Sequence, residues 1–163
     1  MTTWYQAKIR FQREDEKGNN KTINQAFLFD AVSYTDAESR VYNYFAQEIP
    51  DFQLVGLNKM RLTEVFFIES NAELLWFKCR VQYIVFDEKS QQEKKVPYNM
   101  LISATTVKEA YDLLADKLGT VQDYIISDIN VTKILDVIPY EEPVIEDKLS
   151  HGNFKPMSEV QMN

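Results

Sequence analysis

Apolar and polar residues alternate strictly at the start of the chain. Tyr5, Ala7 and Ile9 share one side of an extended segment, and mostly polar residues take the positions between them. Period-two alternation of this kind is typical of a strand with one buried face. The polar run at 14–21 then predicts a hairpin loop, and a second apolar strand follows around residues 24–32.

The pattern changes to helical spacing after this second strand. Ser33 and Asp36 have the spacing of a capping box, in which a hydroxyl and an acid bond the free backbone N–H groups of a helix start. Ala37 and Val41 then recur at helical spacing. A closing strand is predicted over about 53–66, so the first half has the order strand, strand, helix, strand.

The second half repeats this order: Thr106 and Glu109 have the same capping-box spacing, and a closing strand is predicted over about 125–138. Three pairs of segments align at offsets of 72, 73 and 72 residues: 4–17 with 76–89, 27–41 with 100–114, and 57–67 with 129–139. We therefore predict an internal duplication of two β-β-α-β units in an α+β fold. One helix on three strands is a marginal core for about 65 residues. The two units are therefore expected to pack together with pseudo-twofold symmetry.

These patterns predict four segments. The first repeat spans residues 1–67, a linker spans 68–75, and the second repeat spans 76–140. Residues 141–163 contain prolines and many charges without periodicity, which predicts a disordered acidic tail.

Composition and charge narrow the class of protein. With 45% apolar residues and 21 aromatic ones (10 Phe, 9 Tyr and 2 Trp), the 163-residue chain cannot be disordered throughout. The net charge of −7 disfavours a protein that coats nucleic acid indiscriminately, although a local basic face is compatible with it. No window approaches about 18 apolar residues, and no export signal is visible. We expect a cytoplasmic protein with no membrane partner.

The positions of the one histidine and the one cysteine do not favour a catalytic role. His151, the one histidine, lies in the predicted tail, where no neighbour would hold it as a general base. Cys79 takes a strand position between Phe77 and Val81, and a small core residue explains it better than a reactive thiol. With one cysteine, neither an intramolecular disulfide nor a zinc site of several cysteines can form.

Carboxylates recur through the repeat. The acidic turns at 14–17 and 87–89 lack the ligand spacing of a calcium loop and are interpreted as solvated hairpin tips. Glu64 and Asp136 are equivalent in the repeat, as are Arg61 and Lys133. A two-carboxylate hydrolase site is one interpretation of the acids, and a duplicated charged strand edge is the favoured one. We therefore predict no catalytic residue, no metal ligand and no cofactor.

One constellation could form a binding surface. Aromatic and basic residues share the second side of the first strand in each repeat: Trp4, Lys8, Arg10, Trp76, Lys78 and Arg80. Aromatic platforms beside cations hold single-stranded nucleic acid in many proteins. The favoured alternative places both tryptophans in the seam between the units, with the Lys and Arg stems lying over them.

Several segments also resemble one family: WYQAKI (4–9), LFDAVSYTDAES (28–39), WFKCRV (76–81), DEKS (87–90), NML (99–101) and DVIPYE (136–141). The chain is similar, over about residues 3–142, to a family of short uncharacterised proteins from Bacteroidetes and their phages. The resemblance implies a cytoplasmic or phage-encoded accessory protein. It supplies no activity and no catalytic residues.

Two functions from different classes follow. The first is a non-enzymatic interaction or assembly module that binds another protein or itself. The second is a nucleic-acid-binding accessory that uses the six residues of the strand faces. The first needs an exposed apolar patch or a free strand edge, and the second needs exposed, roughly continuous basic faces.

Overall fold

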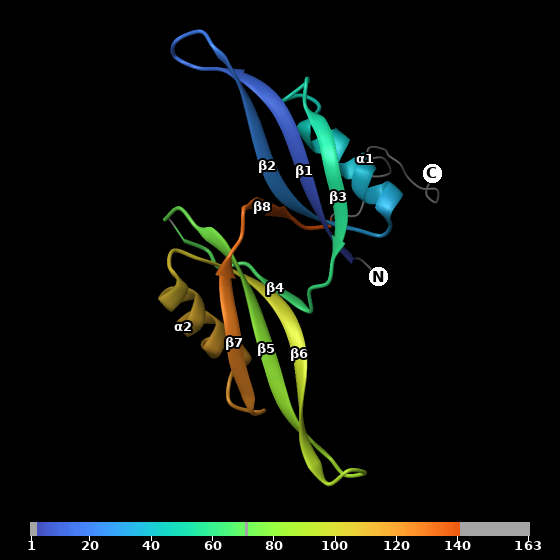
Figure 1. Cartoon of the computed structure of the whole chain (residues 1–163), viewed down its shortest axis with the longest axis vertical. Helices are drawn as coiled ribbons and strands as arrows, with labels where there is room; N and C mark the ends of the chain where they lie inside the picture. Colours follow the sequence, from blue (N-terminus) through green and yellow to red (C-terminus); the bar gives the residue numbers. More distant parts are fainter. Residues whose placement is uncertain (1–2, 71, 141–163) are drawn as a thin grey trace, which may run out of the picture.

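The computed structural model describes residues 3–70 and 72–140, and this part of the chain is an α+β protein of two four-stranded sheets and two helices. The first half contributes β1 (Thr3–Glu14), β2 (Asn20–Ala31), α1 (Tyr34–Phe45), β3 (Gln53–Met60) and β4 (Glu64–Phe66). The second half contributes β5 (Leu75–Asp87), β6 (Gln92–Ala104), α2 (Val107–Leu118), β7 (Tyr124–Val131) and β8 (Ile134–Ile138). The two long hairpins point to opposite ends of the molecule (Figure 1). The predicted tail, including His151, lies outside the described residues.

The alternation at the start of each half places one side of each first strand under a helix. Ala7 and Ile9 of β1 are fully buried in the cluster that α1 covers. Cys79 and Val81 of β5 are fully buried in the cluster that α2 covers. The interpretation of Cys79 as a small core residue is therefore confirmed.

Both helices begin at the predicted capping boxes. The backbone N–H of Asp36 donates to Ser33 Oγ at 3.0 Å, and the N–H of Val32 donates to Asp36 Oδ2 at 3.0 Å. The bond from Val32, together with nearby Arg40, holds the pKa of Asp36 below its usual value. At the start of α2, the N–H of Glu109 donates to Thr106 Oγ1 at 3.1 Å, and the N–H of Thr105 donates to Glu109 Oε1 at 2.9 Å. Local polar chemistry therefore sets both helix starts.

The single closing strand predicted for each half is wrong. The segment 53–66 forms two strands, and so does 125–138. β3 pairs antiparallel with β1, but β4 crosses over and pairs parallel with β6. β8 crosses in the other direction and pairs parallel with β2, so the sheet orders are β3-β1-β2-β8 and β4-β6-β5-β7. Each expected three-stranded sheet thus gains a fourth strand from the other half.

The exchange of β4 and β8 buries apolar residues between the sheets. The buried members of this group, here called the seam cluster, are Leu28, Trp76, Leu101, Ile134 and Val137. Trp4, Met60, Leu62 and Val65 pack against it and are partly buried. Full burial of a side chain of this size contributes about 1.5–3 kcal/mol. This gain explains why the chain leaves its own sheet after β3 and after β7.

We expect Leu28→Ala to lower the free energy of unfolding by about 2–5 kcal/mol, because it opens a cavity in the seam cluster. Leu28 is 0% exposed, whereas Leu135 on the exchanged strand β8 is 54% exposed. Leu135→Ala is therefore the matched control, with an expected change within about 0.5 kcal/mol. Urea unfolding followed by circular dichroism measures both. Equal effects of the two substitutions would contradict a seam that stabilises the fold.

Candidate anion-binding faces

The side of β1 that faces away from α1 is polar and basic. Gln6, Lys8 and Arg10 occupy alternate positions on this side, and both cations are exposed. Asn24 lies opposite Arg10 on β2, and Arg10 Nε donates to Asn24 Oδ1 at 3.2 Å. This bond fixes the direction of the guanidinium while leaving other N–H groups free to donate.

A hollow of about 420 Å³ lies on this side of the first sheet. We call its lining the first open face: Gln6, Lys8, Arg10, Asn24, Gln25, Ala26, Val55 and Lys133. Lys133 comes from the connection between β7 and β8, which crosses from the second sheet. The lining holds three cations and no carboxylate. Within residues 3–70 and 72–140, no ion pair involves any of these three cations.

A smaller hollow of about 190 Å³ lies on the corresponding side of the second sheet. Its lining is the second open face: Lys78, Arg80, Asn99, Asp128 and Asn130. Asp128 is the register partner of Arg80, whereas Gly56 is the register partner of Lys8. A Cβ atom at Gly56 would meet Lys8 Cβ at 3.6 Å, an ordinary contact. The second open face therefore contains a carboxylate where the first has a bare glycine.

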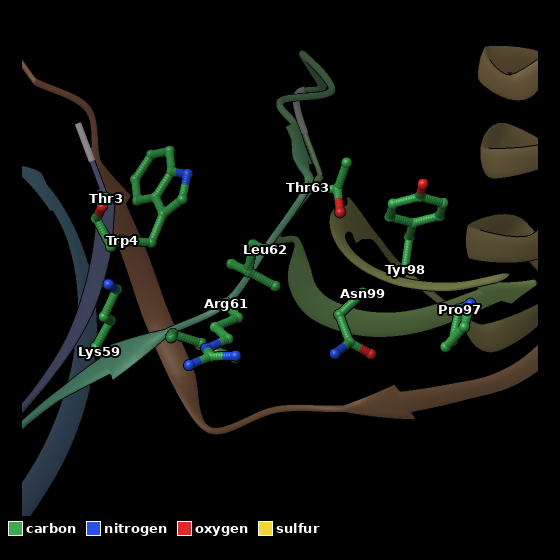
Figure 2. A pocket seen from close by; sticks show the side chains of 10 residues that line it. Thr3, Trp4, Lys59, Arg61, Leu62, Thr63, Pro97, Tyr98 and Asn99 are labelled. Atoms are coloured by element: carbon green, nitrogen blue, oxygen red, sulfur yellow. The ribbon is translucent and has the colours of Figure 1, made fainter. Parts of the chain in front are cut away.

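A third hollow, the junction pocket, has a volume of about 660 Å³ and lies where the chain crosses between the sheets (Figure 2). Its lining is Thr3, Trp4, Lys59, Met60, Arg61, Leu62, Thr63, Pro97, Tyr98 and Asn99. Arg61 lies in the connection between β3 and β4. The N–H of Thr63 donates to the carbonyl of Asn99 at 2.8 Å, which ties this connection to β6. Asn99 also lines the second open face, so the two hollows adjoin.

The six residues of the predicted surface differ in their exposure to solvent. Lys8, Arg10, Lys78 and Arg80 are exposed on the two open faces. Trp76 is 7% exposed, because it belongs to the seam cluster and packs edge-on against Phe67, with the two ring centroids 5.6 Å apart. It is therefore not available to stack on a ligand. Trp4 is partly buried and lines the junction pocket.

Sequence reasoning missed the contribution of Arg61 and Lys133 to these hollows. The signal was present, because the two align in the predicted repeat. The crossing of β4 and β8 carries each cation toward the opposite sheet.

The acids Asp15 and Asp87 of the two hairpin tips serve local structure. Asp15 Oδ1 accepts from the backbone N–H groups of Lys17 and Asn19, at 2.9 and 2.8 Å. Asp87 Oδ1 accepts from the N–H of Lys89, and Lys94 pairs with the same carboxylate at 2.6 Å and lowers its pKa. These contacts match the hairpin-tip interpretation.

Glu64 and Asp136 lie in β4 and β8, so the exchange places them on different sheets, and both are exposed. In the described part of the chain, no group of three or more His, Cys, Asp or Glu side chains is placed to hold a metal ion. Neither described helix has the length and apolar character needed to cross a membrane.

The chain belongs to a family defined by a domain of unknown function, DUF4494, whose model matches residues 3–140. The match covers both sheets, both helices and all three hollows. A search of curated proteins gives no match.

Cys79 is expected to resist thiol reagents in the folded protein. Its burial raises the pKa of the thiol to about 11 from an ordinary 9.0. A rise of about two units lowers the thiolate fraction about a hundredfold at neutral pH. Labelling with a chromogenic disulfide at pH 7.5 should therefore be at least about a hundredfold slower for the folded protein in buffer than for the protein unfolded in about 6 M guanidinium chloride. Rapid labelling of the folded protein would contradict a core role for Cys79.

Proposed function

We propose that this member of a family of unknown function is a non-enzymatic protein that binds single-stranded nucleic acid on its two open faces. The first open face is the observation that supports this most strongly. It gathers Lys8, Arg10 and Lys133 around one hollow without a carboxylate in the lining. Phosphate groups are the anions that such a set of exposed cations binds along a polymer.

The uncharged residues of the faces suit the same ligand. Gln6, Asn24 and Gln25 beside the cations offer both donors and acceptors. Asn99 and Asn130 do the same on the second open face. Amide side chains of this kind contact phosphate oxygens, sugars and base edges in nucleic-acid complexes.

A single strand fits better than a duplex. Duplex readers commonly place a helix in the major groove. Both helices here carry acids on exposed or half-exposed positions: Asp36 and Glu38 on α1, and Glu109, Asp112 and Asp116 on α2. These acids would repel a phosphate backbone. The open sheet faces, with Trp4 at the junction pocket, instead resemble the surfaces on which unpaired strands lie.

The two open faces are best explained as copies produced by an internal duplication. Two registers support this idea: Val65 of β4 pairs with Leu101, and Val137 of β8 pairs with Leu28. These pairs coincide under the offsets of 72 and 73 residues. Two related faces would give one strand two successive sets of phosphate contacts.

We expect saturable binding of fluorescein-labelled single-stranded DNA or RNA that weakens with salt. Each phosphate contact contributes about −0.7 to the slope of log K against log salt. The double variant Lys8→Gln/Arg10→Gln removes two such contacts, so it should make the slope less negative by about 1.4 and weaken binding at low salt. The charge-matched control is Lys108→Gln/Lys117→Gln on α2, which should bind as the unmodified chain does. Fluorescence anisotropy measures both, and equal loss in both variants would contradict the proposed face.

A matched pair at position 56 tests the sign of the charge. Gly56→Asp places a carboxylate opposite Lys8, as Asp128 lies opposite Arg80. Gly56→Asn introduces a side chain of nearly the same shape as that of Asp, but without the charge. We expect Gly56→Asp to bind several-fold more weakly than Gly56→Asn, because the carboxylate neutralises Lys8 and repels phosphate. Equal affinities would argue against phosphate binding at this face.

A protein-interaction module, including self-association, is the second candidate. β3 and β7 are edge strands among the described residues, and they expose Val55, Ile125 and Val131. A free edge with exposed apolar residues can pair with a strand of a partner or of a second copy. A cytoplasmic setting, expected from the sequence, suits either function.

Sedimentation velocity at several concentrations tests self-association through such an edge. If β7 is the interface, Ile125→Lys on this strand should shift the population toward monomer, because a charge at a strand edge opposes pairing. A chain that stays monomeric at every concentration would contradict it.

A further inference from the structure

We infer that the junction pocket binds one nucleotide, with the base against the Trp4 indole and the phosphate on Arg61. The inference deepens the proposed function and rests on it for the source of the nucleotide, which is the bound strand. A free mononucleotide has the same chemistry, so the experiment below separates the two sources.

The lining of the pocket has the composition that a nucleotide needs. It contains two cations, the flat apolar surface of one indole and the polar groups of Thr3, Thr63 and Asn99, and it contains no carboxylate. A nucleotide joins a planar base to an anionic phosphate within one small molecule. Stacking on an aromatic ring and ion pairing with Arg or Lys are the usual contacts of these two parts.

The residues for the base and for the phosphate lie on β1 and just after β3, where the chain crosses between the sheets. Trp4 is on β1, and its indole packs partly against the seam cluster, which limits its rotation. Arg61 follows directly after β3 and precedes Leu62, which packs against the same cluster. The bond from Thr63 to Asn99 fixes the end of this connection. Trp4 and the connection that carries Arg61 are thus held by packing against the seam cluster, while Arg61 itself stays exposed.

Residues of the pocket neighbour residues of both open faces. Along one side of β1, Trp4 is followed by Gln6, Lys8 and Arg10, which line the first open face. On the other sheet, Asn99 lines both the pocket and the second open face. A strand bound to both faces would pass the pocket. The volume of about 660 Å³ is within the range of about 300–1,000 Å³ for small-molecule sites.

Tryptophan fluorescence tests the inference directly. The chain has two tryptophans, and Trp76 is buried in the seam, so quenching by a stacked base reports mainly on Trp4. The full chain is titrated with a thymidine oligonucleotide of about 10 residues, a length typical of single-strand sites. Thymidine monophosphate and inorganic phosphate are titrated separately. Anisotropy of a labelled oligonucleotide measures total binding in parallel.

We expect the oligonucleotide to quench the fluorescence and saturate at low salt. Trp4→Phe should remove the quenching, and Arg61→Gln should weaken oligonucleotide binding about tenfold, near the value of one charge-assisted contact. Arg13→Gln is the charge-matched control, because Arg13 lies at the end of β1 against Phe11, outside the lining of the pocket. Circular dichroism confirms that each variant is folded, and Trp4→Phe keeps an aromatic ring at the seam.

The outcomes separate the pocket from the open faces. Oligonucleotide binding without quenching, and equal in Arg61→Gln and Arg13→Gln, would overturn the pocket and leave the proposed function standing. Quenching by thymidine monophosphate that depends on Arg61, with no oligonucleotide binding, would support a nucleotide site and overturn the proposed function. No binding of either ligand at low salt would overturn both. Equal affinity of the chain for inorganic phosphate and for thymidine monophosphate would overturn the role of Trp4 in holding a base.

Discussion

The reciprocal exchange of β4 and β8 is the interaction on which the rest of the structure depends. Neither half closes its own sheet, because each sheet takes its last parallel strand from the other half. The apolar residues of the exchanged strands meet Leu28 and Leu101 in the seam cluster. A small α+β unit of either half alone would lack this burial, and the two halves are therefore coupled in one fold.

The same exchange assembles the candidate site. The short connections that lead into β4 and β8 carry Arg61 and Lys133 across the molecule toward the opposite sheets. A net charge of −7 is compatible with a basic first open face and junction pocket, because neither lining contains a carboxylate and many of the acids lie on the helices and at the hairpin tips. Electrostatic attraction acts over roughly 10 Å in salt, so the local distribution governs contact with a ligand more than the total does.

The two tryptophans show how far the predicted repeat anticipates the site. Trp4 and Trp76 align in that predicted repeat, and both lie at the seam as the favoured interpretation expected. Yet Trp76 is buried against Phe67, whereas Trp4 lines an open pocket. The four cations of the predicted surface are exposed as a binding role requires. Burial of each indole depends on neighbours distant in the sequence, so equal patterns do not ensure equal exposure.

The sequence by itself determined the features that depend on neighbours a few residues apart. Alternation set the buried sides of β1 and β5, and the Ser33–Asp36 and Thr106–Glu109 pairs set the helix starts. The direction that the chain takes after residues 60 and 131 depends on packing between residues far apart in the sequence. An apolar strand such as β4 or β8 can be buried by pairing with either sheet, and its spacing does not distinguish them. Packing across the seam makes that choice, and with it the placement of Arg61 and Lys133.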